Sequence, residues 1–190
     1  MGIIFPYIKI LRPLNLFFSA LTVIITAYLC DSVHDFTALF NAIIVVVTFA
    51  GASNILNDIL DITIDQKNQP NRPIPKGKIS QKKAFYYMLF LYSVGIYTVL
   101  ALPKLAIAIA IIIVLPILVF YTSYLKRIPL LGNMAIALVL GLVFLFSEAA
   151  LLGTIKKMWT PAWLALDHRA YGSPSTDRYL QSGMAPAHRP

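Results

Sequence analysis

Long apolar runs separated by short polar stretches dominate the first four fifths of the chain. A helix needs about 20 residues to cross a bilayer, and five runs approach or exceed that length. They cover Leu14–Cys30, Thr37–Asn57, Phe85–Leu102, Leu105–Tyr124 and Leu131–Gly153. The pattern predicts an all-α fold, namely a polytopic bundle of about five transmembrane helices. Pro116 lies inside the fourth run, where we expect it to kink the helix.

Composition supports a membrane as the solvent. Of the 190 residues, 58% are hydrophobic and only 13% charged, whereas about a quarter of the residues in a soluble domain are charged. The net charge is +8, but the basic residues cluster between the apolar runs. We therefore expect contact with a lipid bilayer and anionic groups, and no nucleic-acid partner. The single cysteine, Cys30, excludes an internal disulfide framework.

The basic residues also predict an orientation. Lys9 and Arg12 precede the first run, Lys126 and Arg127 follow the fourth, and six more lie between the second and third. These six are Lys67, Arg72, Lys76, Lys78, Lys82 and Lys83. The opposite loops carry Asp31, His34, Asp35 and Lys104. By the positive-inside rule, the protein is a multi-pass cell-membrane protein with a cytoplasmic N-terminus and a cytoplasmic 67–83 loop.

Residues 156–190 differ in composition from the rest. From Met158 to Pro190 the chain has no Ile, Val, Phe, Asn or Lys, and its basic positions are Arg or His. One interpretation is a disordered polar tail, and the other is a segment read out of frame or fused. We therefore expect residues 1–155 to form the transmembrane domain and residues 156–190 to be an atypical tail.

A polar stripe marks the end of the second run. Asn54, Asp58, Asp61 and Asp65 are separated by four, three and four residues, which places them on one face of a helix. Three neighbouring carboxylates repel one another unless a cation lies between them, and hard oxygen ligands suit Mg²⁺. Charges at a membrane span are costly and by default functional. The stripe therefore predicts a magnesium site.

A basic loop follows this stripe directly. Arg72, Lys76 and Lys78 supply cations that fit the oxygens of a diphosphate. Together with the carboxylates and a metal, they describe a site for a metal-bound diphosphate. The alternative is an interfacial cap with a topology signal, which explains Lys82 and Lys83 better than function does.

The run from Asn54 to Pro73 contains Asn-Asp-x-x-Asp-x-x-x-Asp and then Asn-x-Pro-x-Arg-Pro. It resembles the first aspartate-rich signature of the UbiA prenyltransferase superfamily. Weaker similarities are Arg12-Pro-Leu-Asn15, Tyr121-Thr-Ser-Tyr124-Leu-Lys126-Arg127 and Gly132-Asn133. The resemblance covers roughly residues 7–152.

That resemblance implies a membrane enzyme that moves an isoprenoid chain from its diphosphate to a membrane-soluble acceptor through an allylic carbocation. It assigns Asp58, Asp61 and Asp65 to Mg²⁺ and to catalysis. Five residues would bind the donor diphosphate, namely Asn54, Asn57, Asn68, Arg72 and Lys126. Tyr121 and Tyr124 would line the pocket near the allylic carbon.

The stretch Ile64–Gly77 is most similar to the archaeal-lipid and chlorophyll branches. We expect the archaeal-lipid branch, with a geranylgeranyl donor and geranylgeranylglyceryl phosphate as acceptor, because no transit-peptide composition precedes Tyr7. Quinone or chlorophyll synthesis is the alternative within the family. A transporter or channel fragment is the alternative from another class, but it leaves the aspartate stripe and basic loop unexplained.

The sequence departs from the family pattern in its second half. Family members have about nine spans and a second aspartate-rich motif, whereas the acidic residues beyond Asp65 are Glu148, Asp167 and Asp177. We therefore expect this chain to carry half of an active site and to be inactive alone, unless the other half is supplied in trans.

Overall fold

The computed structural model of the chain describes residues 4–123 and 129–156. Within these residues the regular secondary structure is helical throughout, and no strand occurs. In chain order the helices are α1 (Ile4–Ile10), α2 (Pro13–Leu29), α3 (Phe36–Leu60), α4 (Ile62–Asn68), α5 (Gln81–Val99), α6 (Lys104–Ala108), the π-helical segment η1 (Ile109–Val114), α7 (Leu115–Ser123) and α8 (Pro129–Leu152). The all-α prediction is confirmed.

Each of the five predicted spans coincides with a helix or a continuous helical stretch. By length and apolar composition, two described stretches can cross a membrane, α3 and Lys104–Thr122. A third is added if α1 and α2, which meet at an angle of 56°, are counted as one bent span. α5 and α8 lie at the positions of the remaining two. The count of five spans stays a prediction.

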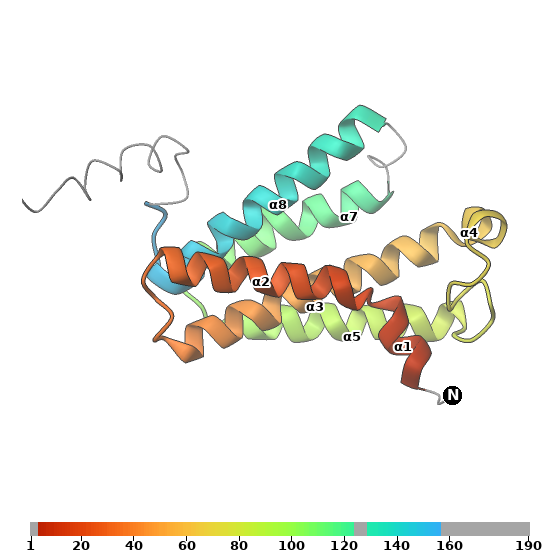
Figure 1. Ribbon diagram of the computed structural model, residues 1–190, viewed down its shortest axis with the longest axis horizontal. Coiled ribbons are helices and arrows are strands. Elements are labelled where there is room, and N and C mark those ends of the chain that lie inside the picture. The colour runs from red at the N-terminus through yellow and green to blue at the C-terminus, as the bar shows by residue number, and fades with distance from the viewer. Residues whose placement is uncertain (1–3, 124–128, 157–190) are drawn as a thin grey trace, which may run out of the picture. The chain divides into compact units, whose positions relative to one another are not determined.

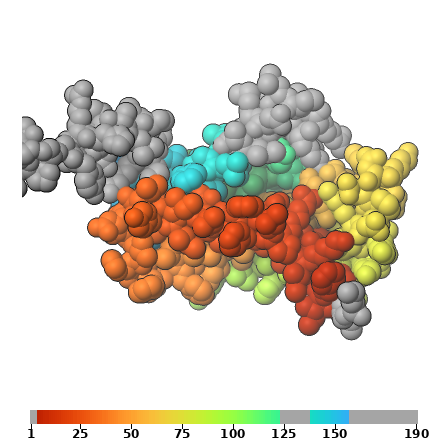
Figure 2. Space-filling model, in the orientation of Figure 1, coloured from red at the N-terminus to blue at the C-terminus, as the bar shows by residue number. Residues whose placement is uncertain are grey.

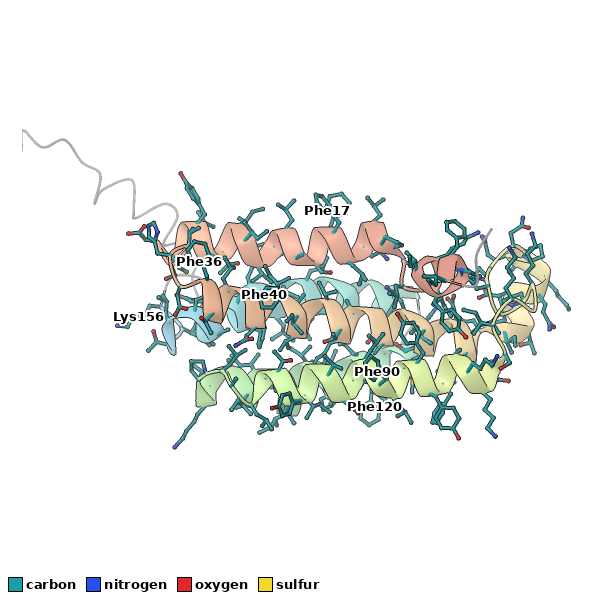
Figure 3. All side chains as sticks on the ribbon, turned by 90° about the horizontal axis from the view of Figure 1, so that it is seen from below. Phe17, Phe36, Phe40, Phe90, Phe120 and Lys156 are labelled. Atoms are coloured by element: carbon teal, nitrogen blue, oxygen red, sulfur yellow. The ribbon has the colours of Figure 1, made fainter. Side chains whose placement is uncertain are left out.

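Large apolar side chains cover the outside of these helices. Phe17, Phe36, Phe40, Phe90 and Phe120 are each more than half exposed, and Figure 3 shows Phe17 pointing away from the neighbouring helices. Exposed apolar surface on this scale marks an interaction surface in a soluble protein. On helices long enough to span a membrane, such an exposed apolar surface is the one that lipid tails cover.

α3 lies at the centre of the helix packing. It contacts α2, α5, α7 and α8, and Figure 1 shows it running beside α2 and α5. The approach of α5 depends on Gly95, because a Cβ atom there would lie 2.5 Å from Cε1 of Phe49 and 2.6 Å from Oγ1 of Thr48. Small residues allow such close contact between membrane helices.

Two clusters of buried apolar residues form the interior. The far-end core joins α2, α3, η1 and α8, and includes Val23, Val45, Phe49, Ile109 and Phe146. The polar-end core joins α1, α3, α5 and the loop between α4 and α5, and consists of Ile10, Ala52, Ile55, Ile74, Ile79, Ala84 and Met88. The polar-end core therefore supports the part of α3 that carries the aspartates.

The fourth predicted span contains the π-helical segment η1, which ends two residues before Pro116. Proline lacks the N–H that would donate to the carbonyl of Ile112, and its ring crowds that carbonyl. A π-helical turn widens the backbone where such a bond is missing. The helix thus passes Pro116 as the continuous stretch Lys104–Thr122.

Three predictions concern residues outside the described part of the chain. They are the pocket role of Tyr124, the diphosphate-binding role of Lys126 and the atypical tail at residues 157–190.

Candidate functional site

The polar stripe keeps its helical register although α3 ends at Leu60. The N–H of Asp61 donates to the carbonyl of Asn57 at 3.0 Å, and the N–H of Asp65 donates to the carbonyl of Asp61 at 2.8 Å. Asp58 at the end of α3 and Asp65 in α4 therefore face the same side, seven residues apart. Their side chains meet at a common partner, Arg72.

Two arginines neutralise these carboxylates. A guanidinium nitrogen of Arg12 lies 2.5 Å from Oδ1 of Asp58. Arg72 bridges both acids, at 2.5 Å from Oδ2 of Asp65 and 3.3 Å from Oδ1 of Asp58. Asp58 is 2% exposed and Asp65 is 5% exposed, so each carboxylate needs a charged partner. The arginine side chains remain about a third exposed, which leaves them open to a ligand.

The loop between α4 and α5 positions Arg72. Ile74 and Ile79 anchor it in the polar-end core. The carbonyl of Pro73 accepts hydrogen bonds from the N–H groups of Lys78 and Ile79, at 3.0 and 3.3 Å. Gly77 has φ +70°, a conformation that glycine adopts without steric cost. The Arg-Pro-Ile-Pro-x-Gly part of the motif is therefore a compact turn that directs Arg72 back to α3 and α4.

Arg12 is the site residue that the sequence analysis did not assign. It lies at the corner between α1 and α2, with φ 56° and ψ 71°. Pro13 disfavours the right-handed helical conformation at Arg12 and is well suited to begin α2. The side-chain amide of Asn54 donates to the carbonyl of Leu11 at 2.9 Å, which fixes this corner to α3. The only signal in the sequence was the Arg12-Pro-Leu-Asn15 similarity.

A cavity of about 390 Å³ opens beside the arginine–carboxylate cluster. Its polar side is formed by Arg12, Asn15, Asn54 and Asn57, and Tyr121 also lines it. An adjoining apolar cavity of about 80 Å³ shares several of its walls. The shared residues are Ser19, Ala50, Leu118, Val139, Leu140 and Val143. The hollow is therefore polar at the Arg12 side and apolar toward the far-end core.

The structure places the other predicted residues as follows. Asp61 and Asn57 are partly buried at the junction of α3 and α4, whereas Asn68 is exposed at the last residue of α4. Lys76 and Lys78 line a different pocket, between α1 and the loop. The cations of the basic loop thus divide between two sites.

The carboxylates fit one kind of magnesium site. Within the described residues, no three His, Cys, Asp or Glu side chains are close enough to form a metal cage. Asp58 and Asp65 nevertheless converge, because one nitrogen of Arg72 contacts both. Mg²⁺ is commonly held by one or two carboxylates together with waters and substrate phosphates. The donor set suits an ion that arrives with a diphosphate.

Comparison with known proteins identifies the family of the chain. The sequence model of the UbiA prenyltransferase family matches residues 16–166. Among curated relatives, digeranylgeranylglyceryl phosphate synthase of Natronomonas pharaonis is 36% identical over 148 residues, which cover 78% of this chain and 53% of the relative. The protein of the same name from Methanoculleus marisnigri is 41% identical over 143 residues, covering 75% and 50%.

A solved structure supports the same relationship. A study of digeranylgeranylglyceryl phosphate synthase in membranes provides a chain that matches with a TM-score of 0.74 and 30% identity. The match covers 79% of this chain and 54% of the solved one, so the chain spans about half the length of the proteins it resembles. The family match covers most of the chain and includes the aspartate stripe and the loop that positions Arg72. The chain is a member of the UbiA prenyltransferase family.

Proposed function

We propose that this protein takes part in prenyl transfer, moving a geranylgeranyl chain from its diphosphate to a lipid acceptor in the membrane. One observation carries the proposal: the Arg12, Asp58, Asp65 and Arg72 cluster adjoins a cavity that becomes apolar with depth. An isoprenyl diphosphate has the same division into an anionic head and an apolar chain. Its head matches the charge of the cluster, and its chain matches the apolar character of the other side.

In the proposed donor site, a metal ion and two arginine side chains together neutralise the diphosphate. Asp58 and Asp65, with Asp61 beside them, would hold Mg²⁺, which neutralises the diphosphate and favours its departure as pyrophosphate. Arg12 and Arg72 contact the carboxylates. On donor binding they would turn their exposed N–H groups to phosphate oxygens, where guanidinium forms bidentate hydrogen bonds. Asn57 would assist from the cavity wall.

The cavity protects the reacting carbon. When the C–O bond to the diphosphate breaks, the electron pair leaves with pyrophosphate and the allylic carbon becomes positive. Tyr121 lines the cavity, and an aromatic face stabilises such a cation. The apolar walls exclude water, which would otherwise capture the cation.

The acceptor proposal draws on the relatives. Several are named digeranylgeranylglyceryl phosphate synthase, so we propose geranylgeranylglyceryl phosphate as the acceptor. Its glycerol hydroxyl oxygen would form a C–O ether bond with the allylic carbon and pass its proton to the departing pyrophosphate. An aromatic acid of quinone synthesis would serve instead if the chain belongs to another branch of the family.

The orientation follows from the basic residues. α1 and the loop that follows α4 lie at the same end of the helices (Figure 1), and both carry lysines. We propose that this end faces the cytoplasm. In a Cys30→Ser background, a Lys78→Cys variant should react with an impermeant maleimide only after the membrane is opened. Labelling in intact cells would contradict this orientation.

The central test uses purified protein with radiolabelled geranylgeranyl diphosphate and Mg²⁺. We expect saturable donor binding that falls at least tenfold when EDTA removes the metal, and no comparable binding of geranylgeraniol, which lacks the diphosphate. Product is then sought with the second half of the active site supplied in trans, with geranylgeranylglyceryl phosphate and with 4-hydroxybenzoate as acceptors. Absence of donor binding would overturn the proposed function, whereas product from 4-hydroxybenzoate alone would overturn only the acceptor.

A further inference from the structure

A second pocket lies between α1 and the loop that follows α4. Its volume is about 270 Å³, and its lining residues come from α1 and from the loop. They are Phe5, Pro6, Lys9, Asn71, Pro73, Lys76 and Lys78. Figure 2 shows the two segments, red and yellow, at the same end of the described chain. Arg12 and Arg72 face the carboxylates instead, so this pocket is separate from the donor site.

The charge of this pocket is entirely positive. Lys9, Lys76 and Lys78 contribute three ammonium groups, and no acidic residue lines the pocket. Among the ion pairs of residues 4–123 and 129–156, none involves these lysines. Nζ of Lys9 donates to the backbone carbonyl of Asn71 at 3.3 Å, which draws α1 and the loop together. Three ammonium groups around one concave site favour an anion.

The flank of the pocket is apolar. Ile4, Phe5 and Ile8 on α1 are 71%, 53% and 49% exposed, and α1 turns 56° away from α2. A short helix with exposed apolar residues and a neighbouring lysine is typical of an interfacial helix, which lies at the level of the headgroups. The ligand that satisfies both features has a phosphate head and an apolar body.

We propose that this pocket binds the phosphate headgroup of an anionic membrane lipid, independently of the prenyl-transfer reaction. The three lysines would donate hydrogen bonds to the phosphate oxygens. Phe5 and its apolar neighbours on α1 would contact the part of the lipid chains nearest the headgroup. Basic pockets on the cytoplasmic side of membrane helices bind lipid headgroups in this manner. The site anchors α1 and the loop to one leaflet.

The alternative is that these lysines act only through their bulk charge as topology signals. The chain offers a matched control, because Lys67, Lys82 and Lys83 are exposed lysines of the same 67–83 segment that do not line the pocket. A triple Lys9→Gln, Lys76→Gln, Lys78→Gln variant and a triple Lys67→Gln, Lys82→Gln, Lys83→Gln variant lose the same charge. All six side chains are exposed, so neither variant removes a buried contact.

The test measures binding of dioctanoyl phosphatidylglycerol to the purified protein in a neutral detergent, with dioctanoyl phosphatidylcholine and inorganic phosphate as comparison probes. We expect phosphatidylglycerol to bind at least tenfold more tightly than either. The pocket variant should lose at least tenfold in affinity, whereas the control variant should change less than threefold.

Several results would overturn the proposal. Equal losses in the two variants would show a bulk-charge effect, and inorganic phosphate binding as tightly as the lipid would remove the apolar contribution. Displacement of phosphatidylglycerol by geranylgeranyl diphosphate would place the lipid in the donor site. Because the lipid is assayed without donor or acceptor, failure here is distinguishable from failure of the proposed function.

Discussion

Three buried hydroxyls near the far-end core and the two buried aspartates at the polar end are held in different ways. Near the far-end core, the buried hydroxyls of Thr26, Thr48 and Ser147 donate to carbonyls of their own helices, at 2.9, 2.7 and 2.7 Å. At the polar end, Asp58 and Asp65 are paired with Arg12 and Arg72, which come from other elements.

This difference separates stability from ligand binding. A hydroxyl bonded within its own helix adds no link between helices and has no reason to change partner. A buried carboxylate paired with a partly exposed arginine is held by charge. A cation can replace the arginine beside the carboxylate, and a diphosphate can replace the carboxylate beside the arginine. The polar end is therefore the part of the molecule in which side chains from different elements can exchange contacts with a ligand.

The largest effect is expected for Asp58→Asn. This change removes one of the two converging carboxylates, so we expect about a 100-fold loss of donor affinity in the presence of Mg²⁺. The matched control is Thr48→Val in the same helix, whose hydroxyl bonds only to backbone within α3. Isothermal titration with geranylgeranyl diphosphate measures both. Near-normal binding by Asp58→Asn would show that the carboxylate does not serve the donor.

Gly95→Ala is expected to affect the packing and spare the site. The added methyl group would lie 2.5 Å from Phe49, which is 2% exposed and packs edge-on against Tyr92. Overpacking of this kind costs about 1–3 kcal/mol. Gly141→Ala in α8 is the control, because within the described residues its added Cβ would meet nothing within 4 Å apart from its chain neighbours and the backbone of its own helix. Thermal unfolding in detergent should show a lower Tm for Gly95→Ala alone, and an unchanged Tm would contradict the close helix contact.

The sequence predicted the helices well, because apolar runs of membrane length leave few alternatives to a helix. The spacing of Asp58 and Asp65 likewise predicted a shared face, since helical period alone decides it. The separate helix α1 was not predicted, because its seven residues fall far short of the length that marks a membrane-spanning run. The π-helical segment before Pro116 was expected only as a kink.

The partners of the carboxylates were beyond sequence reasoning. Arg12 and Asp58 are 46 residues apart, and their contact depends on the corner between α1 and α2. The division of the loop cations was also missed: Arg72 turns to the carboxylates while Lys76 and Lys78 line the other pocket. That division depends on the burial of Ile74 and Ile79, which a motif does not reveal.

Arg72→Ala and Arg12→Ala test which of the two arginines of the polar end contributes more to donor binding. Arg72 contacts two carboxylates and Arg12 contacts one, so we expect about a tenfold rise in donor KM for Arg72→Ala and a smaller rise for Arg12→Ala. The acceptor KM should change less than the donor KM in both variants. Steady-state kinetics with each substrate varied in turn, measured with the second half of the active site supplied in trans, provide the comparison. An acceptor KM that rises more than the donor KM would assign Arg72 to the acceptor.

Asn54→Ala is expected to have the smallest effect. Its amide hydrogen bond to the carbonyl of Leu11 joins α3 to the corner that carries Arg12, and such a bond contributes about 1 kcal/mol. We therefore expect a modest fall in Tm together with weaker donor binding, because Arg12 loses its fixed position. Ser19→Ala is the matched control: Ser19 lines the same cavity but bonds to the carbonyl of Asn15 in its own helix. Donor binding that weakens in Asn54→Ala without any fall in Tm would instead place Asn54 directly on the diphosphate.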